Sequence, residues 1–564
     1  MKEWKIKEID DSLANLPEYP GFILKLLSMR AIRTEEEIND FLNPDYGKLH
    51  DPFLFQDMQK SVERIRAAID KSERICIYAD YDADAITAAV VIFLALQKLG
   101  VEADCYIPDR FTEGYGMNLD AINKIKDKGV GLIITVDCGT NAVEEAKHCK
   151  DLGIDLIITD HHEVTGELPQ AYALINPKNP QDLYPYPYLT GVGVAYKLVQ
   201  ALFSGITYHV TRNIPEGWEK WLLDLVAIGT VADCQSLTME NRILVSFGLK
   251  VLSKTRRTGL RALLTLAAVN LDKVDAYTLG FIIAPRINAA GRIKHADLAF
   301  QLLVSNNQTE AEKLAIELNS LNSHRQGLTE QILSEAKEQV EIISDKKILL
   351  ASGSNWPKGV VGLVAGKLAE EYCRPVLIME RGEVYATGSA RSVANFNMVE
   401  ALGFSKDLLS KYGGHNQAAG FTLPTNNIGA LYQKLLEYAE SINFTNGQPI
   451  LEADAVMEGS ELTWENFDYL KKFGPFGVGN PKPKFVGYGL TLTDFRLVGS
   501  KNQHLKLIVG FGGHVLEAMA FGKSFLQTQL KKGQVLDMVF ELDANEWNGN
   551  KKLQLKIVDL KIKS

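Results

Sequence analysis

The sequence predicts a multidomain α/β protein, in which a parallel-sheet domain and a long helix precede a second α/β domain and a C-terminal β-barrel. Three observations predict this architecture. From about residue 74, short apolar strands alternate with helical stretches, a pattern typical of a parallel sheet covered on both faces. Residues 308–343 form one charge-rich stretch of helical character. Residues 446–564 alternate polar and apolar side chains between short turns, as small barrels do.

The first α/β domain contains most of the expected strands. They cover residues 74–80, 102–108, 132–137, 156–160 and 173–177, and further helices cover about 191–204 and 218–230. The long helix would span about 50 Å at ~1.5 Å per residue, so it is suited to bridging two domains. Because 564 residues are too many for one hydrophobic core, we expect successive parts. They are an N-terminal segment that packs on the core (1–60), the first α/β domain (61–300), the connecting helix (301–345), the second α/β domain (346–445) and the barrel (446–564).

Composition excludes some classes of protein. No apolar run reaches the ~18 residues of a membrane span, and the N-terminus lacks the apolar stretch of a signal peptide. The six cysteines are scattered without CxxC spacing, which predicts reduced thiols in a cytoplasmic protein. The net charge of −9 gives no overall attraction for nucleic acid. Any DNA-binding surface must therefore be local and aided by bound cations.

Carboxylates and histidines follow the strands of the first domain. Because the carboxyl ends of parallel strands meet at one edge, these side chains should converge there. A single Asp at a strand end is more often the N-cap of the next helix, but several such ends, one continuing into His-His, are hard to explain by capping. The residues are Asp80, Asp82 and Asp84 after the first strand, Asp137 after the third, Asp160, His161 and His162 after the fourth, and Asp233 after a later apolar run.

An oxygen-rich cluster with an imidazole suits Mn²⁺ or Mg²⁺ better than structural zinc. Three carboxylates within five residues, at Asp80, Asp82 and Asp84, repel one another unless a cation lies among them. With six candidate ligands there is room for two ions that share a carboxylate. The sequence therefore predicts a two-metal centre at this sheet edge.

Four segments of the first domain resemble the motifs of the DHH phosphoesterase superfamily: DYDADAIT (80–87), TVDCGT (135–140), ITDHH (158–162) and GTVADC (229–234). The resemblance implies that Asp137 bridges two ions, that Asp80 and Asp82 serve one, and that Asp84, His161 and Asp233 serve the other. It also implies that His162 contacts the scissile phosphate and that Asp160 orients a histidine. Ala79 and Ala85 stand where RecJ-type members of the superfamily usually have glycine, which leaves the effect on activity open.

The second α/β domain carries KYGGHNQAAG (411–420), which resembles the DHHA1 domain that closes over substrate in this superfamily. Taken alone, Gly-Gly-His is more often a turn. By resemblance, Gly414 approaches a phosphate and His415 donates to it, with a catalytic role. Ser389 and Arg391 lie side by side in GSARS (388–392), and a guanidinium fork beside a hydroxyl suits a terminal phosphate.

Three further stretches resemble RecJ-type nucleases in particular. They are IPDRFTEGYGM (107–117) with Arg110, IAPRINAAGRI (283–293) with Arg286, Asn288 and Arg292, and FGPFGVGNPKPKF (473–485), which resembles the join to an OB-fold. Together the motifs cover roughly residues 70–560. In SNWPKGVVGLVAGKL (354–368), which also resembles the family, Pro357-Lys358 stands where a His-Pro or similar pair is common.

The resemblance implies a 5′→3′ exonuclease that degrades single-stranded DNA to 5′-mononucleotides with two Mn²⁺ ions, or with Mg²⁺, in DNA repair and recombination. Arg110, Arg292, Ser389 and Arg391 would bind the substrate, and the C-terminal OB-fold would follow the strand. A RecQ-type helicase and a single-strand-binding protein are the implied partners, and a monomer is expected. Two rivals are an oligoribonuclease or cyclic-dinucleotide phosphodiesterase, which are shorter and lack the barrel, and a nuclease-dead DNA-binding scaffold, which would have lost metal ligands.

Overall fold

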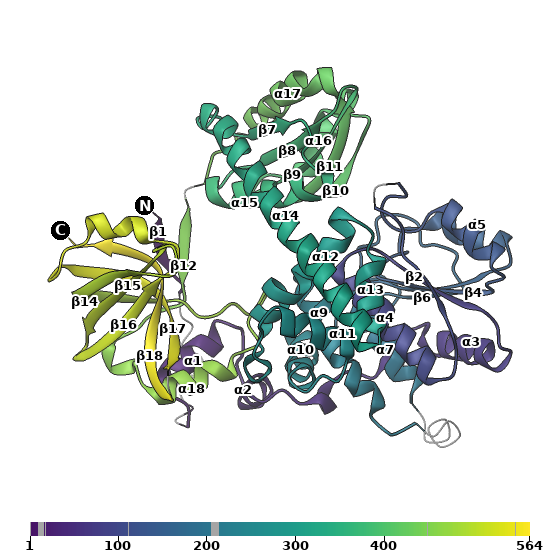
Figure 1. Ribbon diagram of the computed structural model, residues 1–564, viewed down its shortest axis with the longest axis horizontal. Helices are drawn as coiled ribbons and strands as arrows, with labels where there is room; N and C mark the ends of the chain where they lie inside the picture. Colours follow the sequence, from purple (N-terminus) through teal and green to yellow (C-terminus); the bar gives the residue numbers. More distant parts are fainter. Residues whose placement is uncertain are drawn as a thin grey trace.

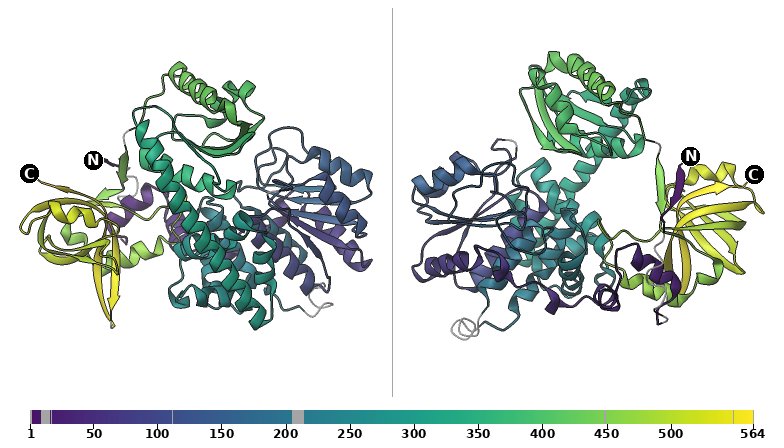
Figure 2. Two further views of the ribbon diagram at one scale, coloured as in Figure 1. Left: turned by 45° about the horizontal axis from the view of Figure 1, so that its top comes forward. Right: turned by 180° about the vertical axis from the view of Figure 1, so that it is seen from behind.

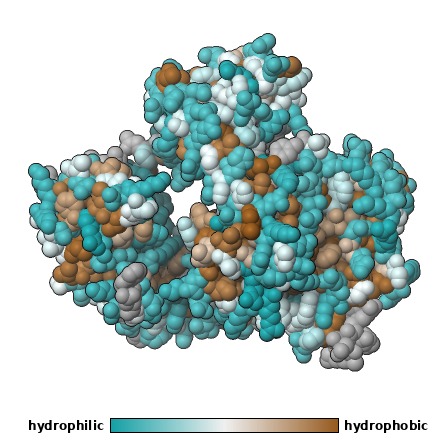
Figure 3. Space-filling view, in the orientation of Figure 1, coloured by the Kyte–Doolittle hydropathy of each residue, from teal (hydrophilic) through white to brown (hydrophobic). Residues whose placement is uncertain are grey.

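The computed structural model describes residues 2–8, 16, 18–110, 112–204, 214–447, 449–547 and 549–563. Figure 1 shows an α/β unit with a thick helical layer, a second α/β unit attached to that layer by one long helix, and a β-barrel on the other side. The helical layer thus lies between the first sheet and the barrel. This arrangement leaves an opening bordered by the barrel, the helical layer and the second α/β unit, visible in the space-filling view of Figure 3.

The first sheet is parallel throughout, with strand order β3-β2-β4-β5-β6. All five strands lie where the sequence predicts them. Strands β2 and β4 are buried along their whole length, because helices cover both faces of the sheet. The strands are β2 (Ile75–Ala79), β3 (Asp104–Tyr106), β4 (Leu132–Val136), β5 (Asp155–Thr159) and β6 (Ala173–Ile175). Helices α3 (Met58–Asp70), α4 (Ala83–Lys98) and α7 (Gly191–Leu202) cover one face, and α5 (Leu119–Asp127) and α6 (Val143–Asp151) cover the other.

The helical layer continues from α7 and shares the core of the first sheet. It consists of η3 (Trp218–Leu222), α9 (Leu223–Ala232), α10 (Met239–Leu252), α11 (Thr258–Leu266), η4 (Leu271–Lys273), a π-helix η5 (Thr278–Ile283), α12 (Ala284–Ile293) and α13 (Asp297–Val304). The π-helix runs directly into α12, so the wide turn and the following α-helix form one continuous rod.

The long helix predicted over 308–343 is α14 (Gln308–Ile342), capped at its start by the Asn307 side chain. Its first half packs on α11–α13 and its second half on the second α/β unit. That unit has the strand order β10-β11-β9-β8-β7, in which only β7 and β8 are parallel. Its strands are β7 (Leu349–Gly353), β8 (Val376–Arg381), β9 (Tyr385–Arg391), β10 (Lys411–His415) and β11 (Ala418–Pro424). Its helices are α15 (Lys358–Tyr372), η6 (Lys406–Leu408), α16 (Met398–Phe404), η7 (Thr425–Asn427) and α17 (Ile428–Ser441).

The C-terminal region is the predicted barrel. Five strands run in the order β14-β15-β16-β18-β17, and pairing of β14 with β17 closes the ring. The short strand β13 adds to β14. The barrel strands are β14 (Phe485–Val498), β15 (His504–Phe511), β16 (His514–Ala520), β17 (Val535–Trp547) and β18 (Asn550–Ile562). The elements that lead into it and connect it are β12 (Ile450–Ala453), β13 (Ala455–Val456), η8 (Gly459–Glu461), α18 (Trp464–Lys472) and η9 (Ser524–Gln529).

The N-terminal segment divides between two units, which differs from the expectation that residues 1–60 pack on the core of the first domain. Strand β1 (Glu3–Ile6) pairs with β12, and helices α1 (Gly21–Ser28) and α2 (Glu35–Leu42) share the core of the barrel. Figure 2 shows this purple segment lying against the yellow barrel in both views. From η1 (Tyr46–Lys48) and η2 (Pro52–Leu54) onward the segment packs on the core of the first unit, and the Phe41 carbonyl in α2 already accepts from Arg242 of α10 at 2.8 Å. The reason is that α1 presents an apolar face to the barrel core, where the Phe22 and Phe485 rings lie 5.2 Å apart.

Candidate metal centre and active site

The predicted carboxylates and histidines do converge at one edge of the first sheet. Asp80, Asp137 and Asp160 directly follow the parallel strands β2, β4 and β5. The later residue, Asp233, follows the last residue of α9. Because α9 packs against α4, the end of a helix supplies a carboxylate to a site that is otherwise built from strand ends.

Capping explains only one of these residues. The Asp82 carboxylate accepts hydrogen bonds from the backbone N–H groups of Asp84 (2.9 Å) and Ala85 (3.0 Å), so it is the N-cap of α4. The Asn288 side chain on α12 accepts from the Ala83 N–H at 2.8 Å and holds the same turn from outside. Ala85 lies within the first turn of α4 with its methyl group fully buried in the core. An alanine therefore fits this position without backbone strain.

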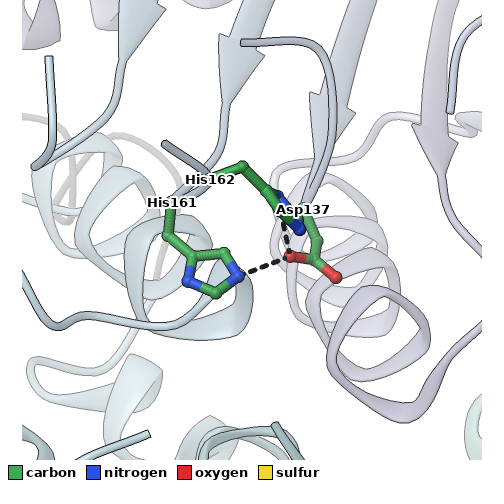
Figure 4. Close-up of side chains that lie close together, drawn as sticks. All are labelled: Asp137, His161 and His162. Atoms are coloured by element: carbon green, nitrogen blue, oxygen red, sulfur yellow. Dashed lines mark ion pairs between the residues drawn. The ribbon is translucent and has the colours of Figure 1, made fainter. Parts of the chain in front are cut away.

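Two groups of side chains could each hold a cation. One is Asp137, His161 and His162, and the other is Asp84, His161 and Asp233; within each group the ligand atoms lie within 4.8 Å of one another. His161 Nε2 is 3.0 Å from Asp137 Oδ1, 3.7 Å from Asp233 Oδ2 and 3.9 Å from Asp84 Oδ2. Figure 4 shows Asp137 directed between the two histidine rings. His161 is the residue common to both groups, and Asp137 is the carboxylate nearest to its ring.

The electrostatics of this cluster call for positive charge. Burial, followed by repulsion from Asp82, raises the pKa of Asp80 to about 8, and burial also raises the pKa of Asp84 and of Asp137 well above the ordinary value. Buried oxygens of Asp80, Asp137 and Asp233 lack any hydrogen-bond partner, although buried polar atoms are normally paired. Divalent cations would supply both the missing contacts and the missing charge, so the residues present fit a metal centre.

His162 is oriented for a different task. Its Nδ1 is 2.7 Å from Asp160 Oδ1, and Asp160 also accepts from the backbone of Thr140 at 2.9 Å. Burial would lower the pKa of His162, but the hydrogen bond and charge of Asp160 outweigh it and raise the pKa to about 9. Nε2 of the same ring lies 3.0 Å from the Tyr115 hydroxyl. His162 therefore presents a charged ring edge to the space beside the carboxylates.

That space is a cleft of about 460 Å³ between the two α/β units. The first unit contributes Tyr115, Thr140 and His162 to its walls, and the second unit contributes Gly414 and His415. Gly414 has a backbone φ of 143°, and a Cβ there would lie 2.3 Å from the Ala418 carbonyl oxygen. Only glycine fits this tight hairpin, which brings His415 to the cleft opposite His162.

A basic pocket adjoins the carboxylates. Arg391 donates to Ser389 Oγ at 2.7 Å, and a Cβ on Gly362 of α15 would lie 3.1 Å from Ser389 Oγ. Arg292 donates to the Gly359 carbonyl at the start of α15. Burial, followed by the charge of Arg110, lowers the pKa of Arg292 to about 10. The predicted residues Arg110, Arg292, Ser389 and Arg391 are thus brought together beside the first turn of a helix, a favourable place for an anion.

Several side chains at this site were not among those predicted from the sequence. Arg325 of α14 is close enough to lower the pKa of Arg292, and its guanidinium is held by Asn322 rather than by a carboxylate. Tyr115 covers His162, and Gly191 packs directly against Asp137. The signal for Arg325 is absent from the sequence, because SHRQGLTEQ reads as a solvated helix face. The sequence signal for Tyr115 was the glycine on either side of it. In the structure both of these glycines, Gly114 and Gly116, have positive φ.

Family models match residues 74–230 (DHH family, N-terminal domain), 345–441 (DHHA1 domain) and 453–559 (RecJ OB domain). The single-stranded-DNA-specific exonuclease RecJ of Bacillus subtilis is 40% identical over 98% of this chain and 69% of that protein. Crystal structures of Thermus thermophilus RecJ with Mn²⁺ and with Mg²⁺ superpose with TM-scores of 0.84 and 0.77 at 27% identity, covering 99% of this chain and 79% and 78% of theirs. Among the described residues, no helix is long and apolar enough to cross a bilayer.

Proposed function

Because the chain belongs to the RecJ family of DHH phosphoesterases, we propose that it is a metal-dependent exonuclease that digests single-stranded DNA from the 5′ end and releases 5′-mononucleotides. The observation that carries the proposal is the placement of a basic pocket directly beside a carboxylate cluster. The charge of Asp82 acts on Arg292, and the charge of Arg110 acts on Asp80. A terminal phosphate in the pocket would therefore place the next phosphodiester over the carboxylates.

The ligand roles come from the family resemblance, and the close grouping of Asp84, His161 and Asp233 supports one of the two sets. Asp80 and Asp82 would hold one divalent ion, Asp84, His161 and Asp233 the other, and Asp137 both. Mn²⁺ suits this mixture of oxygens and one imidazole, with Mg²⁺ as the alternative. When bound, two such ions supply an activated water and stabilise the charge of the leaving oxygen.

The remaining residues bind and orient the phosphodiester. His162, charged at neutral pH, donates from Nε2 to a phosphate oxygen once Tyr115 gives way, while Asp160 holds its ring from behind. His415 donates from the opposite wall of the cleft. Arg391 and Ser389 bind the terminal phosphate, with the planar guanidinium matching two of its oxygens. No side-chain nucleophile is required for this hydrolysis.

The biological setting is part of the same proposal. The barrel would follow the strand that leaves the cleft, since OB-folds commonly bind single strands through charged grooves and aromatic faces. The six cysteines are unpaired, which supports a reducing, cytoplasmic environment. DNA repair and recombination, a monomeric state, and cooperation with a RecQ-type helicase and a single-strand-binding protein complete the proposal.

The test is digestion in Mn²⁺ of one oligonucleotide carrying either a 5′-phosphate or a 5′-hydroxyl. For Arg391→Ala we expect kcat/KM on the phosphorylated strand to fall by about 10- to 100-fold, the range of a lost charged hydrogen bond. The hydroxyl-ended strand should change far less. Arg381→Ala, at the exposed end of β8, is the matched control and should resemble the parent protein. Equal loss on both ends would contradict the pocket, and release of mononucleotides from the 3′ end, or only from RNA, would contradict the proposed activity.

A further inference from the structure

Two large aromatic rings lie stacked and exposed on the helical layer. The rings of Tyr277 and Phe281 have centroids 4.7 Å apart and an interplanar angle of 19°. Tyr277 is 61% exposed and Phe281 is 68% exposed. A stacked pair of this kind leaves a contiguous apolar, π-rich face open to solvent, and exposed faces of this kind often mark binding sites.

The pair lies between the barrel and the metal centre. Four residues before Tyr277, Lys273 Nζ is 3.2 Å from Glu546 Oε2 of barrel strand β17. On the other side, a Cβ on Gly280 would lie 3.3 Å from Val231 Cγ1, and Val231 is two residues from Asp233. Figure 3 shows apolar surface on the edge of the helical layer that borders the opening towards the barrel. A strand passing from the cleft to the barrel would therefore meet this face.

The rings are rigidly supported. Tyr277 directly precedes the π-helix η5, and Phe281 lies within it. Asp275 holds the first turn of this helix, because the Asp275 carboxylate accepts hydrogen bonds from both the N–H and the hydroxyl of Thr278, each at 2.9 Å. The same rod continues into α12, which carries Asn288 and Arg292 of the active site. Single π-helical turns occur often at functional sites. Here the π-helical turn that carries the exposed aromatic face is continuous with α12. That helix supplies Asn288, which holds the turn at the start of α4, and Arg292 of the basic pocket.

We infer that Tyr277 and Phe281 form a base-stacking platform for the single strand between the metal centre and the barrel. The inference rests on the proposed function. A nucleobase matches the rings in size and shape, and stacking tolerates any sequence. A protein partner fits poorly, because specific interfaces bury about 800 Å² per partner, whereas two aromatic side chains supply at most about 250 Å² each. With a net charge of −9, the protein gains strand affinity from stacking that its overall electrostatics do not provide.

The experiment measures KM and kcat in Mn²⁺ on 5′-phosphorylated oligo(dT) strands of increasing length. In the parent protein KM should fall once a strand is long enough to reach the platform. In the double variant Tyr277→Ala/Phe281→Ala that fall should be lost, with KM on long strands raised about tenfold, the equivalent of ~1.4 kcal/mol, and kcat unchanged. Tyr277→Phe/Phe281→Tyr keeps both rings and should behave as the parent. Ile342→Ala, at the far end of α14 and 83% exposed, is the control for loss of an exposed apolar side chain.

A second readout separates stacking from a structural effect. An abasic site introduced at successive positions should weaken binding by the parent protein at the position that meets the platform, and should cost nothing further in the double variant. If the parent digests single strands but the double variant keeps the parent KM at every length, the platform is refuted while the proposed function stands. If the parent digests no single-stranded DNA, the proposed function itself fails. Altered sedimentation of the double variant, with unchanged KM, would show an interface between copies and would also refute the platform.

Discussion

Gly191 offers a test of the metal centre that changes none of its ligands. It is the first residue of α7, and its N–H donates to Asp84 Oδ2 at 2.7 Å. A Cβ at this position would lie 2.4 Å from Asp137 Cβ, 2.5 Å from Asp137 Oδ1 and 2.6 Å from Asp137 Cγ. Asp137 is short, almost fully buried and has a backbone φ of 60°, so it has little freedom to move away. Gly191→Ala should therefore displace the Asp137 carboxylate.

The size of the displacement follows from these contacts. An ordinary Cβ contact begins near 3.4 Å and the closest one here would be 2.4 Å, so about 1.0 Å must be regained (3.4 − 2.4). Metal–ligand distances tolerate about 0.2 Å, and a misplacement of ~1 Å can cost about 10²-fold in rate. We expect kcat/KM to fall by about 100-fold and the Mn²⁺ midpoint to rise. Overpacking should also destabilise the metal-free protein by about 1–3 kcal/mol.

Gly193→Ala is the matched control, because it lies in the same helix and gains the same helix propensity, about 1 kcal/mol. Its Cβ would lie 3.3 Å from Leu189 Cδ2, 3.3 Å from Thr190 Oγ1 and 3.5 Å from Leu189 Cβ, and the leucine side chain can adjust. The assays are exonuclease kinetics, a Mn²⁺ titration of activity, and thermal unfolding in EDTA. Parent-like kcat/KM and a parent-like Mn²⁺ midpoint in Gly191→Ala would show that Asp137 is not a ligand in this geometry.

Three further predictions concern the ligands, the metal and the core. Asp137→Ala should lower kcat by more than about 100-fold while binding of single-stranded DNA stays measurable. A tenfold loss of kcat, equivalent to ~1.4 kcal/mol, would contradict the assignment of Asp137 as the ligand shared by both ions. Mn²⁺ at 100 times its Kd should stabilise the fold by about 2.7 kcal/mol, seen as a higher Tm that EDTA reverses, and no shift would contradict a buried cation site. Glu240→Gln should lower the free energy of unfolding, measured with urea, by about 3–5 kcal/mol. The cause is that the fully buried Lys197 ammonium, 2.7 Å from Glu240, loses its charged partner. A change in that free energy below about 1 kcal/mol would contradict the importance of this ion pair.

The parts of the site that depend on local pattern could be predicted from the sequence. Buried parallel strands carry continuous apolar runs, and their carboxyl ends share an edge, so the convergence of Asp80, Asp137 and Asp160 followed from strand placement alone. The N-cap interpretation, weighed against metal binding for every strand-end Asp, holds for Asp82, which caps α4 through one oxygen.

Features that depend on packing between distant elements could not be predicted in the same way. Arg325 joins the basic pocket only because α14 crosses α12, and nothing in its own helix marks it out. Gly191 matters through the distance of its Cβ from a residue on another element. The attachment of α1 and α2 to the barrel likewise depends on which of two apolar surfaces lies nearer in the folded chain. Periodicity shows that a helix has an apolar face, but not which surface covers it.

The N-terminal segment and the C-terminal barrel pack together, and this has a consequence for synthesis of the protein. Helix α2 ends at Leu42, and the barrel region that receives the N-terminal segment begins at β12 with Ile450, about 400 residues later (450 − 42). At ~5–20 residues per second, the ribosome would need roughly 20–80 s to produce that stretch. During this interval the barrel that receives α1 and α2 is not yet made, whereas the first sheet has all its strands once Ile175 has been added. The N-terminal helices therefore keep an apolar face exposed during this interval, and a chaperone could cover that face while the chain is being made.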